Sequence, residues 1–249
     1  MAEFPKQAKV VIVGLGGIVG SSIAHHLIEL GWDDIVGLDK SAIPTDIGST
    51  SHASDFCYTT GADKFTAYTT QYSQQFFESR GNYVRCGGLE VARVDDDARM
   101  LELKRKIGQG KAFGSRVSLI SPAEAKAKFP LLAEDQIQGA LWDPDAGLVV
   151  PRSQKVAGDL VDEAVASGKL KAFAYTPATK ILVEDGVAVG VETPKGTIMA
   201  DYLVLCAGIW GSLVSNTADV KLPLLPLEHP LLFFGPWDHL EGTGKDIVY

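Results

Sequence analysis

The chain has 249 residues, of which 46% are hydrophobic and 22% are charged, so it holds enough apolar material for one large domain or two interleaved ones. Its formal net charge of -8 argues against nucleic acid or an anionic membrane as the main partner, because no basic surplus neutralises phosphates. No apolar run reaches the roughly 18 residues that a membrane-spanning helix needs.

The first forty residues predict a βαβ unit. Residues 10–13 form a β-branched run that is typical of a buried parallel strand. After a glycine-rich turn, apolar residues at helical spacing predict a helix that ends near Gly31. Residues 35–38 predict a second strand, and Asp39 follows it. Strand, turn, helix and strand together make one βαβ unit.

The rest of the chain predicts a mixture of helices and strands, which is an α/β pattern. Helices are expected over residues 65–79, 95–111 and 153–167, with a further helix starting at Ser121-Pro122, and a loop over residues 41–61. Strands are expected over residues 89–94, 181–192 and 197–205, with residues 202–205 buried. We expect the aromatic series from Phe65 to Phe77 to lie in the core.

The run of residues 14–20 predicts a dinucleotide-binding turn. Gly14 and Gly16 have the usual spacing, while the third glycine falls one residue late, at Gly20. Glycine is required because a pyrophosphate must approach backbone N–H groups at a helix N-terminus, where a Cβ would intrude. Gly17, Ile18 and Val19 belong to the same expected contact surface. The flanking strands, helix and acidic residue favour this interpretation over a tight turn without a ligand.

Asp39 ends the second predicted strand. A carboxylate there accepts hydrogen bonds from a ribose hydroxyl pair, which favours FAD or NAD over NADP. The alternative is a solvated aspartate at a strand end. Lys40, the next residue, is part of the same predicted site.

Ser49, Thr50, Ser51 and His52 follow after a short loop. Taken alone, a hydroxyl-rich loop with one histidine is usually only a loop. Its hydroxyl groups can nevertheless bind phosphate or ribityl oxygens, and a neutral imidazole is a competent nucleophile.

Short motifs along the chain carry a resemblance to a known family. They are residues 11–20, 31–32, 38–39, 48–53, 87–92, 103–106, 119–125, 130–132, 206–211 and 222–229. Together they resemble the D-amino-acid-oxidase-like flavoprotein superfamily, and more narrowly its dimethylglycine oxidase and sarcosine/dimethylglycine dehydrogenase branch. The similarity runs from about Lys9 to His229. The Ser-Thr-Ser-His and Pro-Leu-Leu-Pro-Leu-x-His elements are specific to this branch, whereas the glycine turn is not.

The resemblance implies roles for individual residues. His52 matches the histidine that carries FAD through a covalent bond to the flavin 8α-methyl group, with Ser49, Thr50 and Ser51 beside the cofactor. His229 matches a histidine near substrate and flavin, and is expected to orient substrate or share in proton handling; the alternative is a buried, hydrogen-bonded histidine. Four further residues complete the expected cofactor site: Phe56, Ala178, Ala207 and Gly208.

The resemblance also implies the domain organisation. The expected fold is a Rossmann-like FAD-binding domain with a central parallel sheet, interleaved with the start of a mixed-sheet substrate domain. Residues 1–85 and 151–215 are expected to form the FAD-binding domain, 86–150 an inserted substrate-domain segment, and 216–249 the start of the substrate-domain sheet. The family's returning C-terminal segment is missing from the sequence, so we expect a fragment without the C-terminal closure of the fold.

The implied activity is that of an FAD-dependent oxidoreductase. It would oxidise the C–N bond of a secondary or tertiary amine, such as dimethylglycine or sarcosine, by hydride transfer to a covalent flavin. The expected partners are a small amine and an electron acceptor, either oxygen or an electron-transfer protein. Two alternatives stay open: an NAD-dependent dehydrogenase, in which residues 49–52 have no purpose, and a truncated, non-catalytic dinucleotide-binding fragment.

The sequence predicts a reducing compartment and no metal site. Its three cysteines form no Cys-x-x-Cys pair, so neither a disulfide framework nor a zinc site is expected. The N-terminus carries no signal-peptide pattern, so the expected location is the cytoplasm, with mitochondria left open.

Overall fold

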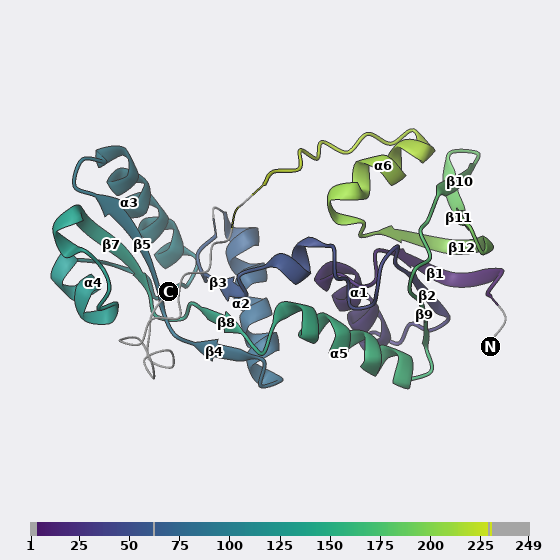
Figure 1. Cartoon of the computed structure of the whole chain (residues 1–249), viewed down its shortest axis with the longest axis horizontal. Helices are drawn as coiled ribbons and strands as arrows, with labels where there is room; N and C mark the ends of the chain where they lie inside the picture. The colour runs from purple at the N-terminus through teal and green to yellow at the C-terminus, as the bar shows by residue number, and fades with distance from the viewer. Residues whose placement is uncertain (1–3, 62, 229, 231–249) are drawn as a thin grey trace. The chain divides into compact units, whose positions relative to one another are not determined.

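The computed structural model describes residues 4–61, 63–228 and 230, which form two compact units (Figure 1). Unit 1 contains the described residues up to Ala53 and from Pro151 onward, and unit 2 contains the described residues between Ser54 and Val150. Each unit has its own sheets and its own hydrophobic core.

Unit 1 is built on a six-stranded sheet with the strand order β10-β11-β12-β1-β2-β9. Its parallel part joins β1 (Gln7–Val13) to β2 (Ile35–Leu38) and to the second half of β12 (Gly196–Leu205), and β2 to β9 (Leu170–Phe173). β10 (Lys180–Glu184), β11 (Val187–Thr193) and the first half of β12 are antiparallel. The predicted βαβ unit and the strands expected over residues 181–192 and 197–205 are therefore confirmed.

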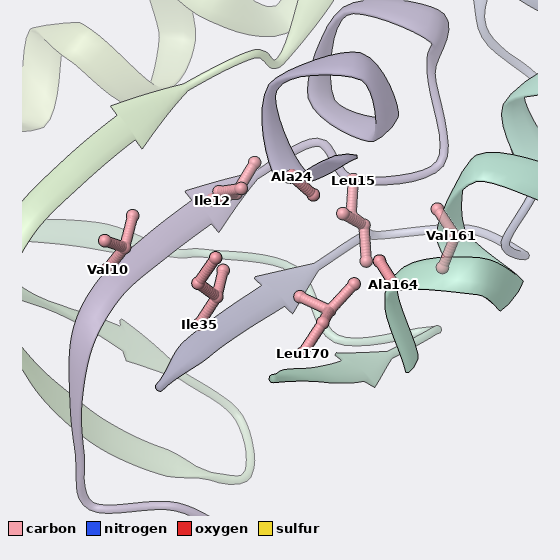
Figure 2. Packing of buried hydrophobic residues seen from close by; sticks show 8 residues of the cluster. All are labelled: Val10, Ile12, Leu15, Ala24, Ile35, Val161, Ala164 and Leu170. Carbon is pink, nitrogen blue, oxygen red and sulfur yellow. The ribbon is translucent and has the colours of Figure 1, made fainter. Parts of the chain in front are cut away.

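Two helices pack on one face of the parallel strands. α1 (Ile18–Glu29) connects β1 to β2, and α5 (Ser153–Ala166) precedes β9. Figure 2 shows the core between sheet and helices, made of Val10, Ile12, Leu15, Ala24, Ile35, Val161, Ala164 and Leu170. The opposite face has a second core that includes residues from β11 and β12. Because both faces are covered, β1 and β2 are almost entirely buried, as their β-branched sequence predicted.

The second half of β12 differs from its prediction. Residues 202–205 were expected to be buried, but Tyr202 is 54% exposed and Leu203, Val204 and Leu205 are half-buried. The cause is strand pairing: β12 pairs with β11 only up to Met199, and beyond it pairs only with β1 among the described residues.

Unit 2 contains two three-stranded antiparallel sheets. One has the order β3 (Phe56–Cys57), β8 (Gly147–Val149), β4 (Tyr83–Arg85), and the other β5 (Gly88–Arg93), β7 (Ile137–Asp143), β6 (Ser118–Ile120). Its helices are α2 (Lys64–Ser79), α3 (Asp97–Ala112) and α4 (Pro122–Lys128). α3 packs on β5 and β7 around buried Leu103 and Leu141, and Ser121 and Glu124 form the predicted capping box of α4.

The aromatic face of α2 corrects another expectation. Phe65 is 75% exposed, and Tyr68 and Tyr72 are also exposed, so these residues do not belong to the core. The helix instead buries Ala67 and Gln74, and Gln74 donates to the backbone oxygen of Asp145 at 2.9 Å. A helical period identifies the faces of a helix, but tertiary contacts decide which face is covered.

The division into units differs from the predicted boundaries. The structural units divide the chain after Ala53 and after Val150, whereas the sequence predicts domain boundaries after residues 85, 150 and 215. The reason is that β3 and β4, which lie between residues 53 and 85, both pair with β8. The segment from residue 216 was expected to begin a substrate-domain sheet; its described part contains the short helix η4 (Asn216–Ala218), has no strand and belongs to unit 1.

None of the helices in the described part of the chain combines the length and the apolar character needed to cross a membrane.

Candidate functional site

A pocket in unit 1 lies at the carboxyl ends of β1, β2 and β12. In open parallel sheets this is the edge at which ligands bind. Its walls come from the β1–α1 turn, the segment after β2, the residues after β9 and the residues after β12. The lining residues predicted from the sequence are Gly14, Gly17, Ile18, Val19, Asp39, Lys40, Ser49, Thr50, Ala178, Ala207 and Gly208.

Two of the predicted glycines are required by close packing. Gly14 has a φ of +96°, and a Cβ there would lie 2.3 Å from the carbonyl oxygen of Cys206. A Cβ on Gly20 would lie 2.2 Å from the carbonyl oxygen of Gly14. The glycine that packs helix against strand is therefore Gly20, and the late spacing seen in the sequence corresponds to one extra residue in the turn.

The N-terminus of α1 opens into this pocket. The first backbone N–H groups of a helix have no partner within the helix and carry its positive dipole end. Thr50 Oγ1, on the short helix η1 (Ser49–His52), accepts a hydrogen bond from the N–H of Ile18 at 3.0 Å. The next N–H groups, those of Val19 and Gly20, have no partner within the helix. This arrangement is a general anion-binding geometry.

Asp39 lines the pocket but turns its carboxylate toward the protein. Its Oδ2 accepts from the N–H of Gly16 at 2.8 Å, and its Oδ1 accepts from the N–H and hydroxyl of Ser41 at 2.9 and 3.0 Å. Gly16 itself does not line the pocket, because it packs against residues 42–45.

His52 ends η1 and is exposed. Its Nδ1 lies 3.0 Å from the carbonyl oxygen of Gly48 and 3.0 Å from Ser51 Oγ. A carbonyl accepts only, so this contact requires a proton on Nδ1. In the neutral ring the lone pair is then on Nε2, the nitrogen that can act as a nucleophile.

Lys40, which was predicted, and Trp210, which was not, reach the pocket from segments that follow different strands. Lys40 follows β2, and its Nζ lies 3.3 Å from the ring centroid of Trp210, which follows β12. Both residues line the pocket. The cation–π contact brings the segments that follow β2 and β12 together on either side of β1.

Not every predicted site residue lies at this pocket. Gly16 packs against residues 42–45 and Gly20 against the carbonyl of Gly14, so neither lines the pocket. Ser51 and His52 follow the lining residues of η1. Phe56 belongs to β3 of unit 2. His229 lies outside the described residues.

Several lining residues were missed by the sequence reasoning. They are Val13, Leu38, Thr45, Ile47, Gly48, Thr176, Pro177, Cys206, Ile209, Trp210 and Val214. Cys206 and Trp210 lie in the 206–211 motif and could have been found from it. Burial raises the pKa of the Cys206 thiol to about 11, so this thiol stays protonated at neutral pH. Thr45 and Thr176 had no signal, because their position depends on loop packing.

The residues of the pocket fit the dinucleotide part of FAD. Backbone N–H groups at the α1 N-terminus and the Thr50 hydroxyl suit a pyrophosphate. The close packing at Gly14 and Gly20 keeps the turn free of side chains. The negative charge of Asp39 suits an adenosine without a 2′-phosphate.

Comparisons with known proteins agree with this geometry. The model of the family of FAD dependent oxidoreductases matches residues 9–247. The chain is 33% identical to the mouse mitochondrial pyruvate dehydrogenase phosphatase regulatory subunit. The match covers 94% of this chain and 27% of the mouse protein. The chain is 32% identical to human mitochondrial sarcosine dehydrogenase over 90% of its length and 25% of that protein. It thus spans about a quarter of these relatives.

Among solved structures, the L-proline dehydrogenase of P. horikoshii resembles the chain with a TM-score of 0.78 and 27% identity. The match covers 88% of this chain and 57% of that protein. The predicted α/β fold is therefore confirmed.

Proposed function

The chain belongs to the family of FAD-dependent oxidoreductases, and we propose that it binds FAD in the unit 1 pocket and oxidises the C–N bond of a secondary or tertiary amine. The observation that carries the proposal is the convergence of the glycine turn, the α1 N-terminus and Thr50 on one pocket. Sarcosine and dimethylglycine are the proposed substrates, and the similarity to a sarcosine dehydrogenase supports that class.

FAD, when bound, supplies the acceptor for a hydride from the N-methyl carbon. The protein's part is to bind and orient. The N–H group of Val19, which lines the pocket, binds the pyrophosphate, and Thr50, whose oxygen accepts from Ile18, donates its own proton to the same group. Ile47 and Ile209 supply apolar surface to the lining of the pocket.

We also propose that His52 attaches the flavin covalently. With Nδ1–H held by the carbonyl of Gly48, Nε2 would be the nitrogen that holds the flavin through its 8α-methyl carbon. Breaking a C–H bond of that methyl group would leave the flavin reduced by two electrons, which the electron acceptor would remove. The position of His52 directly after the pocket-lining residues Ser49 and Thr50 supports this role. His229 remains proposed as a substrate-orienting or proton-handling residue, and Phe56 as a cofactor contact.

The test is the absorbance spectrum of the purified chain after acid precipitation, with FAD added during refolding if needed. We expect a flavin spectrum that stays with the precipitate. His52→Ala should release the flavin to the supernatant, whereas His26→Ala should not, although His26 Nδ1 also contacts a backbone oxygen, that of Ser22, at 2.7 Å. Acid-stable flavin in His52→Ala contradicts the attachment site.

Substrate class is tested by anaerobic bleaching of the flavin. We expect sarcosine or dimethylglycine to bleach the visible absorbance band of oxidised flavin. Glycine lacks an N-methyl group and should leave this band unchanged. A colourless chain that binds NAD instead would establish the dehydrogenase alternative.

A second candidate function is regulatory binding without catalysis. The 33% identity to a protein named as a phosphatase regulatory subunit favours it. In that case the chain would bind FAD but no amine would bleach the flavin. Oxygen or an electron-transfer protein is the proposed electron acceptor only if bleaching occurs.

We propose the cytoplasm or mitochondria as the site of action. The relatives named above are mitochondrial proteins, which supports the second location. Cell fractionation with an antibody against this chain distinguishes the two.

A further inference from the structure

The carboxylate of Asp39 is engaged by the protein itself. Its side chain is only 7% exposed, and three protein donors reach its two oxygens. Gly16 N–H bonds to Oδ2, while the N–H and the hydroxyl of Ser41 bond to Oδ1.

The loop after β2 makes a second hydrogen bond to the backbone of Gly16. Thr45 N–H donates to the carbonyl oxygen of Gly16 at 2.9 Å, and Thr45 Oγ1 lies 3.0 Å from Ser41 Oγ. Gln154, on α5, donates to the carbonyl oxygen of Thr45 at 2.8 Å. Gly16 is thus held at both its N–H and its C=O. We name Asp39, Ser41, Thr45 and Gln154 the Gly16 clamp.

A count of acceptor sites limits what else Asp39 can bind. An ionised carboxylate has about four lone-pair sites, two on each oxygen. Ser41 uses both sites of Oδ1, and Gly16 uses one site of Oδ2. One site on Oδ2 is left, whereas a 2′,3′-hydroxyl pair bound side by side needs two.

We propose that Asp39 is a positioning residue of the Gly16 clamp and accepts at most one ribose hydroxyl of the bound dinucleotide. The inference rests on the proposed function, because it concerns the adenosine part of the same ligand. The negative charge still rejects a 2′-phosphate, but loss of one hydroxyl is tolerated. The sequence predicts a carboxylate that accepts from both ribose hydroxyls, and the proposal limits it to one.

Nucleotide analogues test the limit of one hydroxyl. The flavin-free His52→Ala chain is titrated by calorimetry with ADP, 2′-deoxy-ADP and 3′-deoxy-ADP. We expect at least one deoxy analogue to bind within about threefold of ADP, because the hydroxyl that it lacks makes no hydrogen bond to Asp39. The inference is overturned if both analogues bind more than threefold weaker and Asp39→Asn removes the difference.

Amide hydrogen exchange tests the clamp without any ligand. The exchange rate of the Gly16 N–H is measured by NMR in the wild-type chain and in Asp39→Ala, with Ser41→Ala as a milder variant if Asp39→Ala does not fold. We expect exchange at Gly16 to become at least tenfold faster in Asp39→Ala and to rise by a smaller factor in Ser41→Ala.

Asp34→Ala is the matched control, because Asp34 also accepts from a backbone N–H, that of Lys9 at 3.2 Å, away from the pocket. Unchanged exchange at Gly16 in both clamp variants overturns the positioning role. If the wild-type chain binds neither ADP nor FAD, the proposed function is refuted instead. The exchange measurement at Gly16 still tests whether Asp39 positions the Gly16 clamp.

Discussion

The two units bury polar groups in different ways. In unit 1 the polar groups at the pocket are mainly backbone N–H groups and hydroxyls, and the N–H groups of the first α1 turn lack partners within the helix. In unit 2 the buried polar groups include three carboxylates, those of Glu90, Asp143 and Asp145. Asp143 is 0% exposed and accepts from Thr59 N–H at 2.7 Å and Thr59 Oγ1 at 2.8 Å, and from the N–H groups of Asp145 and Ala146.

The other two buried carboxylates of unit 2 pair with cations. Asp145 accepts from Arg85 and Arg116, and Glu90 from Arg99 and Lys106. These carboxylates find their partners within unit 2, so they do not indicate a ligand. The comparison teaches that buried polar groups mark a binding site when their donors are directed into a pocket, and mark structure when donor and acceptor already meet.

The largest effect is expected from adding a methyl group to Gly20. Its Cβ would lie 2.2 Å from the carbonyl oxygen of Gly14, so the turn must shift, at a cost of about 3 kcal/mol. We expect Gly20→Ala to weaken FAD binding about 100-fold, measured by titration in the His52→Ala background. Gly108→Ala is the control, because Gly108 lies on α3 without a positive φ and a Cβ there meets nothing within 4 Å. Equal FAD affinity in Gly20→Ala and the wild-type turn would contradict the steric argument.

Removal of the Asp143 carboxylate is expected to affect unit 2 only. Asp143→Ala leaves buried donors of Thr59, Asp145 and Ala146 without their acceptor, at a cost of about 3 kcal/mol. Calorimetry should show a lower Tm, while ADP affinity stays within about twofold. If Asp143→Ala also weakened ADP binding, the buried polar groups of unit 2 would not be purely structural.

A smaller effect is expected at the hydroxyl that joins η1 to α1. Thr50→Val keeps the shape but removes the acceptor of the Ile18 N–H, which costs about 1 kcal/mol. FAD should bind about five- to tenfold more weakly, because the donor to the pyrophosphate is lost as well. Thr50→Ser retains the hydroxyl and should restore most of the affinity. If both variants bind FAD equally, the hydroxyl has no part in the site.

The smallest effect is the pH dependence of unit 2. Hydrogen bonds from Arg116 and the charges of Arg116 and Arg85 hold the pKa of Asp145 below its ordinary value, although burial opposes this. The resulting stabilisation is present above the ordinary aspartate pKa of about 4 and is lost as the pH falls through the lower folded-state pKa. Thermal melts should therefore show stability declining below about pH 4.

Asp145→Asn should reduce this decline. The control is Asp159→Asn on α5, whose carboxylate pairs with Lys155 at the surface. A pH profile that is identical in wild-type and Asp145→Asn chains would remove Asp145 from the explanation.

Much of unit 1 could be predicted because its signals are local. The β-branched run of β1, the helical spacing in α1 and the glycines between them lie within about thirty residues, and the structure has each element where it was expected. The late position of the third glycine was also visible in the sequence. Close packing of Gly20 against the carbonyl of Gly14 explains why a glycine is needed there.

Residues that depend on distant contacts could not be predicted in the same way. Thr45 and Thr176 line the pocket only because their loops pack beside β1 and β2. The structural units divide the chain after Ala53 because β3 and β4 pair with β8, which lies about sixty residues or more further along the chain. The exposure of Phe65 likewise depends on which neighbours cover α2.

The sequence by itself determined the βαβ unit, its glycine turn and the family to which the chain belongs, because each depends on residue types at short spacing. Tertiary structure alone decided where the carboxylate of Asp39 points. Sequence position places this residue at the end of β2, where a ribose binds, but Gly16, Ser41 and the loop to Thr45 turn its oxygens inward. Hydrogen-bond geometry between segments that are distant in sequence sets how many acceptor sites remain for a ligand.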